Sequence, residues 1–565
     1  MENDGELFIP IIIIGAGMSG IAAGCQLKEK LGFDQFRIFD RQAEPGGIWF
    51  SHRYPGVACD VPAPLYSYSF APNSKWSTLK PSGAEILGYL TDVCRKYRIC
   101  DHFQGNTEVT ALQWDNDHEE WTAQATVYTD SQSPAKSPDR SNTRSVKIRA
   151  KAVISAVGKF SKPNTSGLER IAGVEDFKGP IVHTAHWDES IDLQGKDVIV
   201  VGTGCTAAQL IPKLVSPAIN AASVTQLIRT PPWVAPELLS ARGLYLWEKY
   251  MPWLMQHIPG VMFFVRLVIF GITESHFFRF FRVGGWAPLF RSQKAAQLLE
   301  YMKRTVPQKY HGMLTPLYEV GCKRLIHDAG WYRSLQDPRV QVLQMSLKRL
   351  HRNSVILQPP AERSDAQTPD EVSVSADAII LATGYNVQQY IPTLKIAGRN
   401  GVDLHALWEQ RGGAHAYLGL AVDHFPNLYL LSGPNTSSGY TSVLLGIENN
   451  LQYILQLLRP LVNDEIKTCE VKHDACWRWT EKIQAVSEQS VWVKGGCRSW
   501  YIGDGKWNPT IYPFSHIYAM CSTWYPAWSD WSVVRTPKGE RQRRTRFAIC
   551  VLLLVLAAIY MLFYR

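Results

Sequence analysis

The sequence has no C-x-x-C pair among its eleven cysteines and no apolar stretch at its start. Enzymes that exchange disulfides need a redox-active cysteine pair, so the missing motif excludes that class. Residues 1–4 are acidic and lead directly into a strand, which indicates that there is no secretory signal. We therefore expect the cysteines to be reduced thiols in the cytosol.

Charge is missing from one long segment near the end of the chain. Residues 547–564 (FAICVLLLVLAAIYMLFY) contain no charged side chain. A helix of this length spans roughly 27 Å, which matches a thin bilayer. A buried core helix is the alternative, but such a helix usually has a polar stripe, and this segment has none. The pattern predicts a single-pass C-terminal transmembrane helix.

The basic charge of the chain is concentrated just before that segment. Residues 536–546 carry five Lys and Arg side chains against one Glu, close to half of the net charge of +9. This distribution argues against a nucleic-acid-binding face on the globular body. Positive flanks stay on the cytosolic side of a membrane, so we expect a basic linker and a body in the cytosol.

A glycine-rich loop lies near the start of the chain. Residues 8–14 (FIPIIII) are typical of a parallel strand buried on both faces, and GAGMSG follows at 15–20. The glycines of such a loop permit a tight turn, close approach to a pyrophosphate and packing of the next helix. The helix N-terminus then attracts the phosphates. The second strand ends at Asp40, where a ribose hydroxyl would meet it, so we expect an FAD site.

The same strand–loop–helix–strand unit recurs at residues 197–228. The strand DVIVV is followed by GTGCTA at 202–207, in which Ala207 replaces the last glycine. The next strand (SVTQLI) ends in Arg229. An acidic residue there would repel a 2′-phosphate, whereas arginine pairs with one. This site is predicted to bind NADPH; the alternative is an arginine at the surface with no ligand.

Two such units predict an α/β fold with two Rossmann-like dinucleotide-binding domains. The buried strand at residues 376–382 (ADAIILA) is expected to return the chain to the first domain, so that the second is inserted into the first. The predicted FAD-binding domain comprises residues 1–179 and 376–535. The NADPH-binding domain comprises residues 180–375, with a helical insertion at about 236–310. A basic linker (536–546) and the transmembrane helix (547–564) complete the chain.

The helical insertion contains a second apolar run. Residues 244–290 are aromatic and helical, and residues 258–273 could be taken for a membrane span. Arg266 in the middle of that run and Pro259-Gly260 near its start argue against a span. We interpret the segment as a helical subdomain that either lines a substrate entrance or contacts the membrane.

Two fingerprints then narrow the class of enzyme. GGIW at 46–49 is followed by YPG at 54–56 and by Asp60, and F-x-G-x-x-x-H-x-x-x-W spans residues 177–187. Both strings resemble those of the Baeyer–Villiger monooxygenases, a class of flavoprotein monooxygenases. The related N- and S-oxidising enzymes usually end the second string in Tyr or Phe, so Trp187 favours the ketone-oxidising branch. The resemblance covers about residues 8–535, with further matches at RTP (229–231), GCKR (321–324), ATGY (382–385), FPN (425–427) and SWY (499–501).

The resemblance implies roles for individual residues. Arg324 looks like the active-site arginine beside the flavin and Asp60 like the carboxylate that holds it; the alternative is a purely structural ion pair. Lys323 and Arg229 would grip the NADPH 2′-phosphate, and Trp500 would contact the nicotinamide ribose. His183 resembles a histidine that couples the domains. The full predicted cofactor-binding set is Gly15, Gly17, Ser19, Gly20, Asp40, Gly47, Ile48, Trp49, Phe50, Ser51, Ala58, Cys59, Asp60, Tyr66, Val109, Thr203, Gly204, Cys205, Thr206, Ala207, Ala208, Gln209, Arg229, Thr230, Lys323 and Trp500.

The implied reaction uses FAD, NADPH and O2, and no metal. Because the C-x-x-C motif is absent, oxygen is the leading electron acceptor. A C4a-peroxyflavin attacks a ketone, and an ester or lactone forms while Arg324 stabilises the oxyanion. The alternatives are an N- or S-oxygenating or epoxidising flavin monooxygenase and a catalytically inactive membrane scaffold. Cys59, Cys205 and Cys322 are expected to be packing residues. The anchor indicates a fungal-type member that acts on a lipophilic secondary metabolite at the endoplasmic reticulum.

Overall fold

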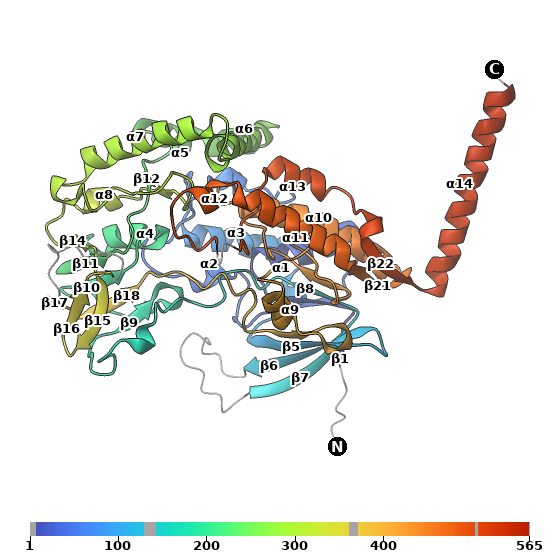
Figure 1. Ribbon diagram of the computed structural model, residues 1–565, viewed down its shortest axis with the longest axis horizontal. Helices are drawn as coiled ribbons and strands as arrows, with labels where there is room; N and C mark the ends of the chain where they lie inside the picture. Colours follow the sequence, from blue (N-terminus) through green and yellow to red (C-terminus); the bar gives the residue numbers. More distant parts are fainter. Residues whose placement is uncertain (1–6, 129–142, 361–370, 503–506, 564–565) are drawn as a thin grey trace.

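The computed structural model describes residues 7–128, 143–360, 371–502 and 507–563. Two lobes, each built on a five-stranded parallel sheet, lie side by side (Figure 1). Helices α5, α6 and α7 run along one side of the body, and α14 projects away from it. This is the predicted α/β fold with two Rossmann-like units.

The first parallel sheet has the strand order β20-β8-β2-β3-β4 (Leu428–Leu430, Ala152–Ser155, Ile11–Ile14, Phe36–Phe39, Phe103–Gln104). Helix α1 (Met18–Leu31) connects β2 to β3 and packs against α10 (Val443–Val462). The expected single strand at 8–14 is wrong in one respect. Pro10 divides the expected strand in two, because proline has no backbone N–H to donate to a neighbouring strand. The part before it, β1 (Leu7–Phe8), pairs with β7 (Thr143–Ala150) in another sheet.

The second parallel sheet has the order β14-β11-β10-β18-β9 (Val340–Leu343, Ser223–Leu227, Asp197–Val201, Ala378–Leu381, Ile181–His183). Helix α4 (Cys205–Leu214) connects β10 to β11. Strand β18 corrects the expectation for residues 376–382. It pairs with β10 and β9 and therefore belongs to the second sheet, and the chain returns to the first lobe only after it.

Smaller sheets and helices complete the body. One mixed sheet has the order β1-β7-β6-β5-β19, where β6, β5 and β19 are Glu120–Tyr128, Thr107–Asp115 and Lys395–Ala397. The remaining strands are β12 (Val234–Ala235), β13 (Ile326–His327), β15 (Ser346–His351), β16 (Ser354–Gln358), β17 (Val372–Ser375), β21 (Ile466–Val471) and β22 (Trp531–Arg535). The remaining helices of the two lobes are α2 (Ile48–Ser51), α3 (Gly83–Lys96), α8 (Trp331–Ser334), α9 (Leu404–Gln410), α11 (His473–Glu488), α12 (Val491–Lys494) and α13 (His516–Ser522).

The expected helical insertion consists of α5 (Ala241–His257), α6 (Val261–His276), a π-helical turn (Phe277–Phe281) and α7 (Ala287–Thr305). Helix α6 contacts the short 3-10 helix Ala63–Leu65 of the first lobe. The insertion therefore contacts both lobes, although its residues are inserted in the chain of the second lobe.

Helix α14 (Pro537–Phe563) is continuous, so the basic segment expected as a linker is its first part. The apolar residues of α14 from 547 to 561 are exposed, which rules out the alternative of a buried core helix. Among the described residues, Val261–Phe281 and Pro537–Met561 are the helical segments long and apolar enough to cross a membrane.

Candidate active site

A continuous cavity of about 2240 Å³ lies between the two lobes and reaches both glycine loops. Sites for one small ligand usually measure about 300–1,000 Å³, so this cavity has room for more than one. Nearly all of the residues predicted from the sequence line it. The exceptions are Gly20, Ala207 and Ala208, which pack inside their own loop–helix units.

The first glycine loop leaves backbone donors free for a phosphate. Gly17 caps α1 without any side-chain hydrogen bond, so no side chain competes for the first N–H groups of the helix. A Cβ on Gly47 would lie 2.7 Å from the Cα of Gly17, so only glycine allows these two backbones to meet. Asp40 accepts hydrogen bonds from the backbone N–H groups of Ala16 (2.6 Å) and Gln42 (2.8 Å), which holds its carboxylate at the edge of the loop.

The second loop has the same form. Gly204 caps α4 without a side-chain bond, and a Cβ added to it would meet open space. Arg229 is exposed and follows β11, the strand next to the one that precedes the loop, and Lys323 lies on the cavity wall with its ammonium 5.0 Å from the ring centre of Tyr318. Both loops therefore have the donors and the open space that a dinucleotide pyrophosphate requires.

Asp60 and Arg324, 264 residues apart in the chain, form a two-pronged ion pair in the wall of this cavity. The guanidinium donates from Nε to Oδ2 (2.8 Å) and from Nη2 to Oδ1 (2.7 Å). The thiol of Cys205 lies 3.7 Å from Oδ2. The YPG–Asp segment, the GCKR segment and the second glycine loop thus meet at one point. The pairing of Asp60 with Arg324 was predicted, whereas the contact with Cys205 was not.

The pair stays ionised at neutral pH. Burial alone would raise the pKa of Asp60, but the charge and hydrogen bonds of Arg324 outweigh it and hold that pKa below its usual value. In return Asp60 raises the pKa of Arg324, against the opposing effect of burial. Burial raises the pKa of the Cys205 thiol to about 12 and that of Cys59 further, so neither is a thiolate nucleophile.

Several cavity residues were not predicted. Tyr501 is buried beside Arg324. Burial raises the pKa of its hydroxyl to about 12, although the positive charge of Arg324 acts in the opposite direction. Tyr54 donates to Gln209 (2.8 Å), and Gln209 donates to the carbonyl of Ala58 (3.0 Å), so these residues join the two lobes. The SWY and YPG strings contained both tyrosines, but nothing in the sequence showed their partners.

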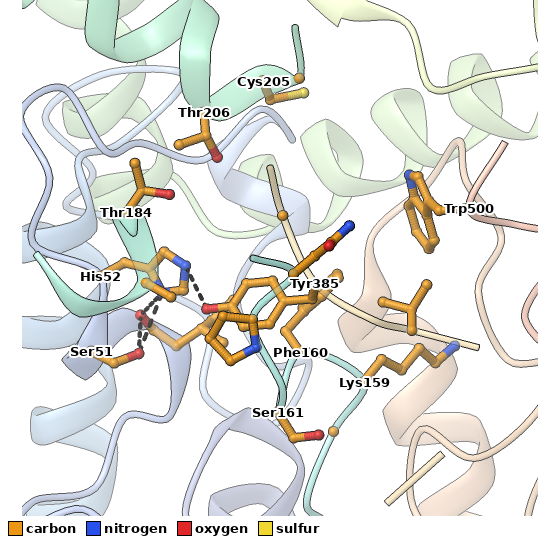
Figure 2. Close-up of a pocket in the computed structure, with 18 of the residues that line it drawn as sticks. Ser51, His52, Lys159, Phe160, Ser161, Thr184, Cys205, Thr206, Tyr385 and Trp500 are labelled. Carbon is orange, nitrogen blue, oxygen red and sulfur yellow. Dashed lines mark hydrogen bonds between the residues drawn. The ribbon is translucent and has the colours of Figure 1, made fainter. Parts of the chain in front are cut away.

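Figure 2 shows a third group around Tyr385. The Tyr385 hydroxyl and Nε2 of His52 are 3.0 Å apart in a hydrogen bond. Phe160 stands between Tyr385 and Trp500, with ring centres 5.4 and 6.4 Å away, and Trp500 remains 41% exposed. Lys159 lines the same region and donates to Ser437 (2.5 Å); burial lowers its pKa to about 7.

His183 lies at the end of β9, where it pairs with Leu381 of β18. Its Nδ1 accepts from the backbone N–H of Ala185 (3.0 Å), and its ring meets Tyr385 edge-on. Burial, aided by the nearby His186, lowers the pKa of His183 to about 4, so the ring is neutral and suits a structural role.

The cysteines differ from expectation at one pair. Cys322 and Cys497 form a disulfide with their Cα atoms 6.1 Å apart, whereas the other nine cysteines are free thiols. Cys322 is therefore not simply a packing residue. Cys322 precedes Lys323 and Arg324, and Cys497 precedes the segment of Trp500, so the disulfide joins two walls of the cavity. The two cysteines are 175 positions apart, so no local sequence pattern could predict the bond.

Comparison with known proteins identifies the class. Residues 13–79 match the model of an NAD(P)-binding Rossmann-like domain. A Baeyer–Villiger monooxygenase of Pseudomonas aeruginosa is 32% identical over 511 residues, which cover 89% of this chain and 87% of the relative. An FAD-binding monooxygenase of Aspergillus niger is 28% identical over 89% of this chain and 78% of its own. The crystal structure of a Rhodococcus cyclohexanone monooxygenase bound to NADP+ superposes with a TM-score of 0.74 at 23% identity, covering 94% of this chain and 100% of that one.

These matches define an oxidoreductase of the flavoprotein monooxygenase class. The chain belongs to the Baeyer–Villiger monooxygenase family.

Proposed function

We propose that the chain is an FAD- and NADPH-dependent monooxygenase that inserts one oxygen atom of O2 beside a ketone carbonyl and so forms an ester or lactone. The observation that carries this proposal is the ion pair of Asp60 and Arg324. It places a fixed positive charge in the wall of a cavity that both glycine loops share.

The two cofactors are assigned to the two loops. FAD would lie on the first loop, with its pyrophosphate at the N-terminus of α1 and its rings toward Trp49 and Tyr66, which meet edge-on 5.8 Å apart. NADPH would lie on the second loop, with its 2′-phosphate at Arg229 and Lys323. The names of an FAD-binding relative and of a neighbour bound to NADP+ support both assignments.

Arg324 supplies what the chemistry needs from the protein. Reduced FAD, when bound, supplies the activated oxygen. Arg324 would stabilise the oxyanion that develops on the ketone, and it cannot give up a proton by mistake because its pKa is raised still further by Asp60. Asp60 fixes the direction of the guanidinium through two hydrogen bonds.

Helix α14 supports a proposal about where the enzyme lies in the cell. We propose that this helix crosses the membrane of the endoplasmic reticulum, with its basic N-terminal part and the body on the cytosolic side. The substrate would then be a lipophilic ketone, such as an intermediate of secondary metabolism. The apolar length of α14 supports this proposal.

The test is Arg324→Ala in the full chain, with Arg339→Ala as the matched control. Arg339 also makes a two-pronged pair, with Asp337, but that pair lies outside the residues that line the cavity. We expect Arg324→Ala to leave flavin reduction by NADPH largely intact and to abolish ester formation, while Arg339→Ala retains both. Normal ester formation by Arg324→Ala would contradict the proposal, and oxidation of amines or sulfides without ketones would favour the N- or S-oxygenating alternative.

A further inference from the structure

The helical insertion and the neighbouring helix α13 expose large apolar side chains. On α5 and α6 these include Trp253, Phe264, Val268 and Ile272, which are 55–63% exposed, and on α13 they include Ile517 and Met520. We call the exposed apolar side chains of α5, α6 and α13 the apolar face. Surfaces of this kind usually mark a binding partner.

The two charged residues in the apolar stretch of α6 both turn away from this face. Arg266 donates from Nη1 to the carbonyls of Pro64 (2.6 Å) and Ser67 (3.0 Å) in the first lobe. Glu274 is 4% exposed. Arg266 therefore holds α6 to the first lobe, and its charge does not reach the outer side of the helix. A helix bound to the body on one side and apolar on the other is suited to lying flat in a membrane interface.

Glu274 also joins α13 to the same surface. Its carboxylate accepts hydrogen bonds from the backbone N–H groups of His516 (3.2 Å) and Ile517 (3.1 Å), the first residues of α13. The Tyr440 hydroxyl donates to it as well (3.2 Å). Because α13 is held to α6 in this way, Ile517 and Met520 become part of the apolar face.

A lipid bilayer fits the surroundings of this face better than a protein partner does. Figure 1 shows α14 pointing toward the side of the body on which α5, α6 and α7 lie. The first part of α14 is strongly basic, as expected beside anionic headgroups. Arg279 is exposed and stands over the ring of Phe290 (5.7 Å), and Trp253 stacks on His257, so cationic and aromatic groups of the interfacial type accompany the aliphatic ones.

We propose that the apolar face lies in the interfacial layer of the bilayer that α14 crosses, so that the body is docked on the membrane in one orientation and not merely tethered to it. Helix α13 would then separate membrane from cavity, because His516 and Ala519 on its other side, and Thr523 directly after it, line the cavity. A lipophilic ketone could pass beside α13 from the bilayer; this last step alone rests on the proposed function.

The experiment uses the full chain in vesicles of phosphatidylcholine and phosphatidylserine that contain radiolabelled phosphatidylcholine. The photoreactive residue benzoylphenylalanine replaces Phe264, or in the control Phe8, another exposed phenylalanine (63% and 40%). Phe8 lies in β1, on the opposite side of the body (Figure 1). We expect several-fold more labelled lipid on the chain from position 264 than from position 8. Equal capture at the two positions, or capture of a second copy of the chain by position 264, would overturn the proposal.

A second variant guards against a local disturbance by the probe. With benzoylphenylalanine at Trp524, which is 68% exposed just after α13, the double substitution Phe264→Glu and Val268→Glu should lower lipid capture several-fold, because charge opposes entry into the interface. Unchanged capture would count against docking by α6. Neither measurement of lipid capture depends on oxygenation. The docking proposal can therefore be refuted while the Arg324→Ala result supports the proposed function, and the proposed function can be refuted while docking is supported.

Discussion

Replacing Asp60 by Asn would remove one of the two acceptors that hold Arg324 and leave an amide N–H₂ facing a guanidinium N–H. Both hydrogen bonds are short, at 2.8 and 2.7 Å. A hydrogen bond to a charged group contributes about 1.5–3 kcal/mol. The side chains of Arg324 and Asp60 are 34% and 24% exposed, so water screens part of the interaction and the lower figures, about 1.5–2 kcal/mol, apply. At 1.36 kcal/mol per tenfold change, ester formation should slow roughly 10–30-fold.

The assay separates the two halves of the reaction. Anaerobic stopped-flow measures flavin reduction by NADPH, which should change little in Asp60→Asn. Product analysis with a ketone and O2 measures ester formation, which should fall while hydrogen peroxide release rises. Asp337→Asn is the matched control, because Asp337 and Arg339 form a similar pair with 26% and 32% exposure outside the cavity lining. Parallel loss of reduction and ester formation, or an unchanged rate of ester formation, would refute the role of Asp60.

Two further predictions concern other cavity residues. Arg229→Ala should raise the KM for NADPH by roughly tenfold, about 1.4 kcal/mol, and leave the KM for NADH unchanged, since only NADPH carries the 2′-phosphate; steady-state kinetics with both cofactors checks this. Lys159→Met should raise the melting temperature of the holoenzyme most below pH 7. Burial lowers the folded pKa of Lys159 from 10.5 to about 7, so its cost to stability is complete below pH 7 and fades as the pH rises toward 10.5. Melting curves from pH 6 to pH 10 that keep a constant difference would contradict this.

Much of the fold and of the cavity could be predicted because the signals are local. Each glycine loop stands between its own strand and helix, and the residues chosen from these loops line one cavity, apart from Gly20, Ala207 and Ala208. Those three residues were predicted to bind cofactor only because they belong to the glycine-rich motifs. The motifs need them for packing, since a Cβ on Gly20 would overlap the carbonyl oxygen of Gly15.

What could not be predicted depends on partners distant in sequence. Strand β18 has the apolar pattern of any buried parallel strand, and that pattern fits either sheet equally well. The contact of Tyr54 with Gln209 spans 155 residues, and the bond of Cys322 with Cys497 spans 175. Only the packing of the two lobes decides such pairings. The direction of the Arg266 side chain could not be predicted for the same reason, because its hydrogen-bond acceptors are backbone carbonyls of the other lobe.

The disulfide between Cys322 and Cys497 closes a covalent ring in the chain. A protease that cuts one peptide bond inside this ring produces two fragments that remain attached, and only a reductant can release them. A cut outside the ring separates the fragments at once, unless folding holds them together. The segment of Arg324 and the segment that leads to Trp500 therefore stay joined even when the backbone between them is severed.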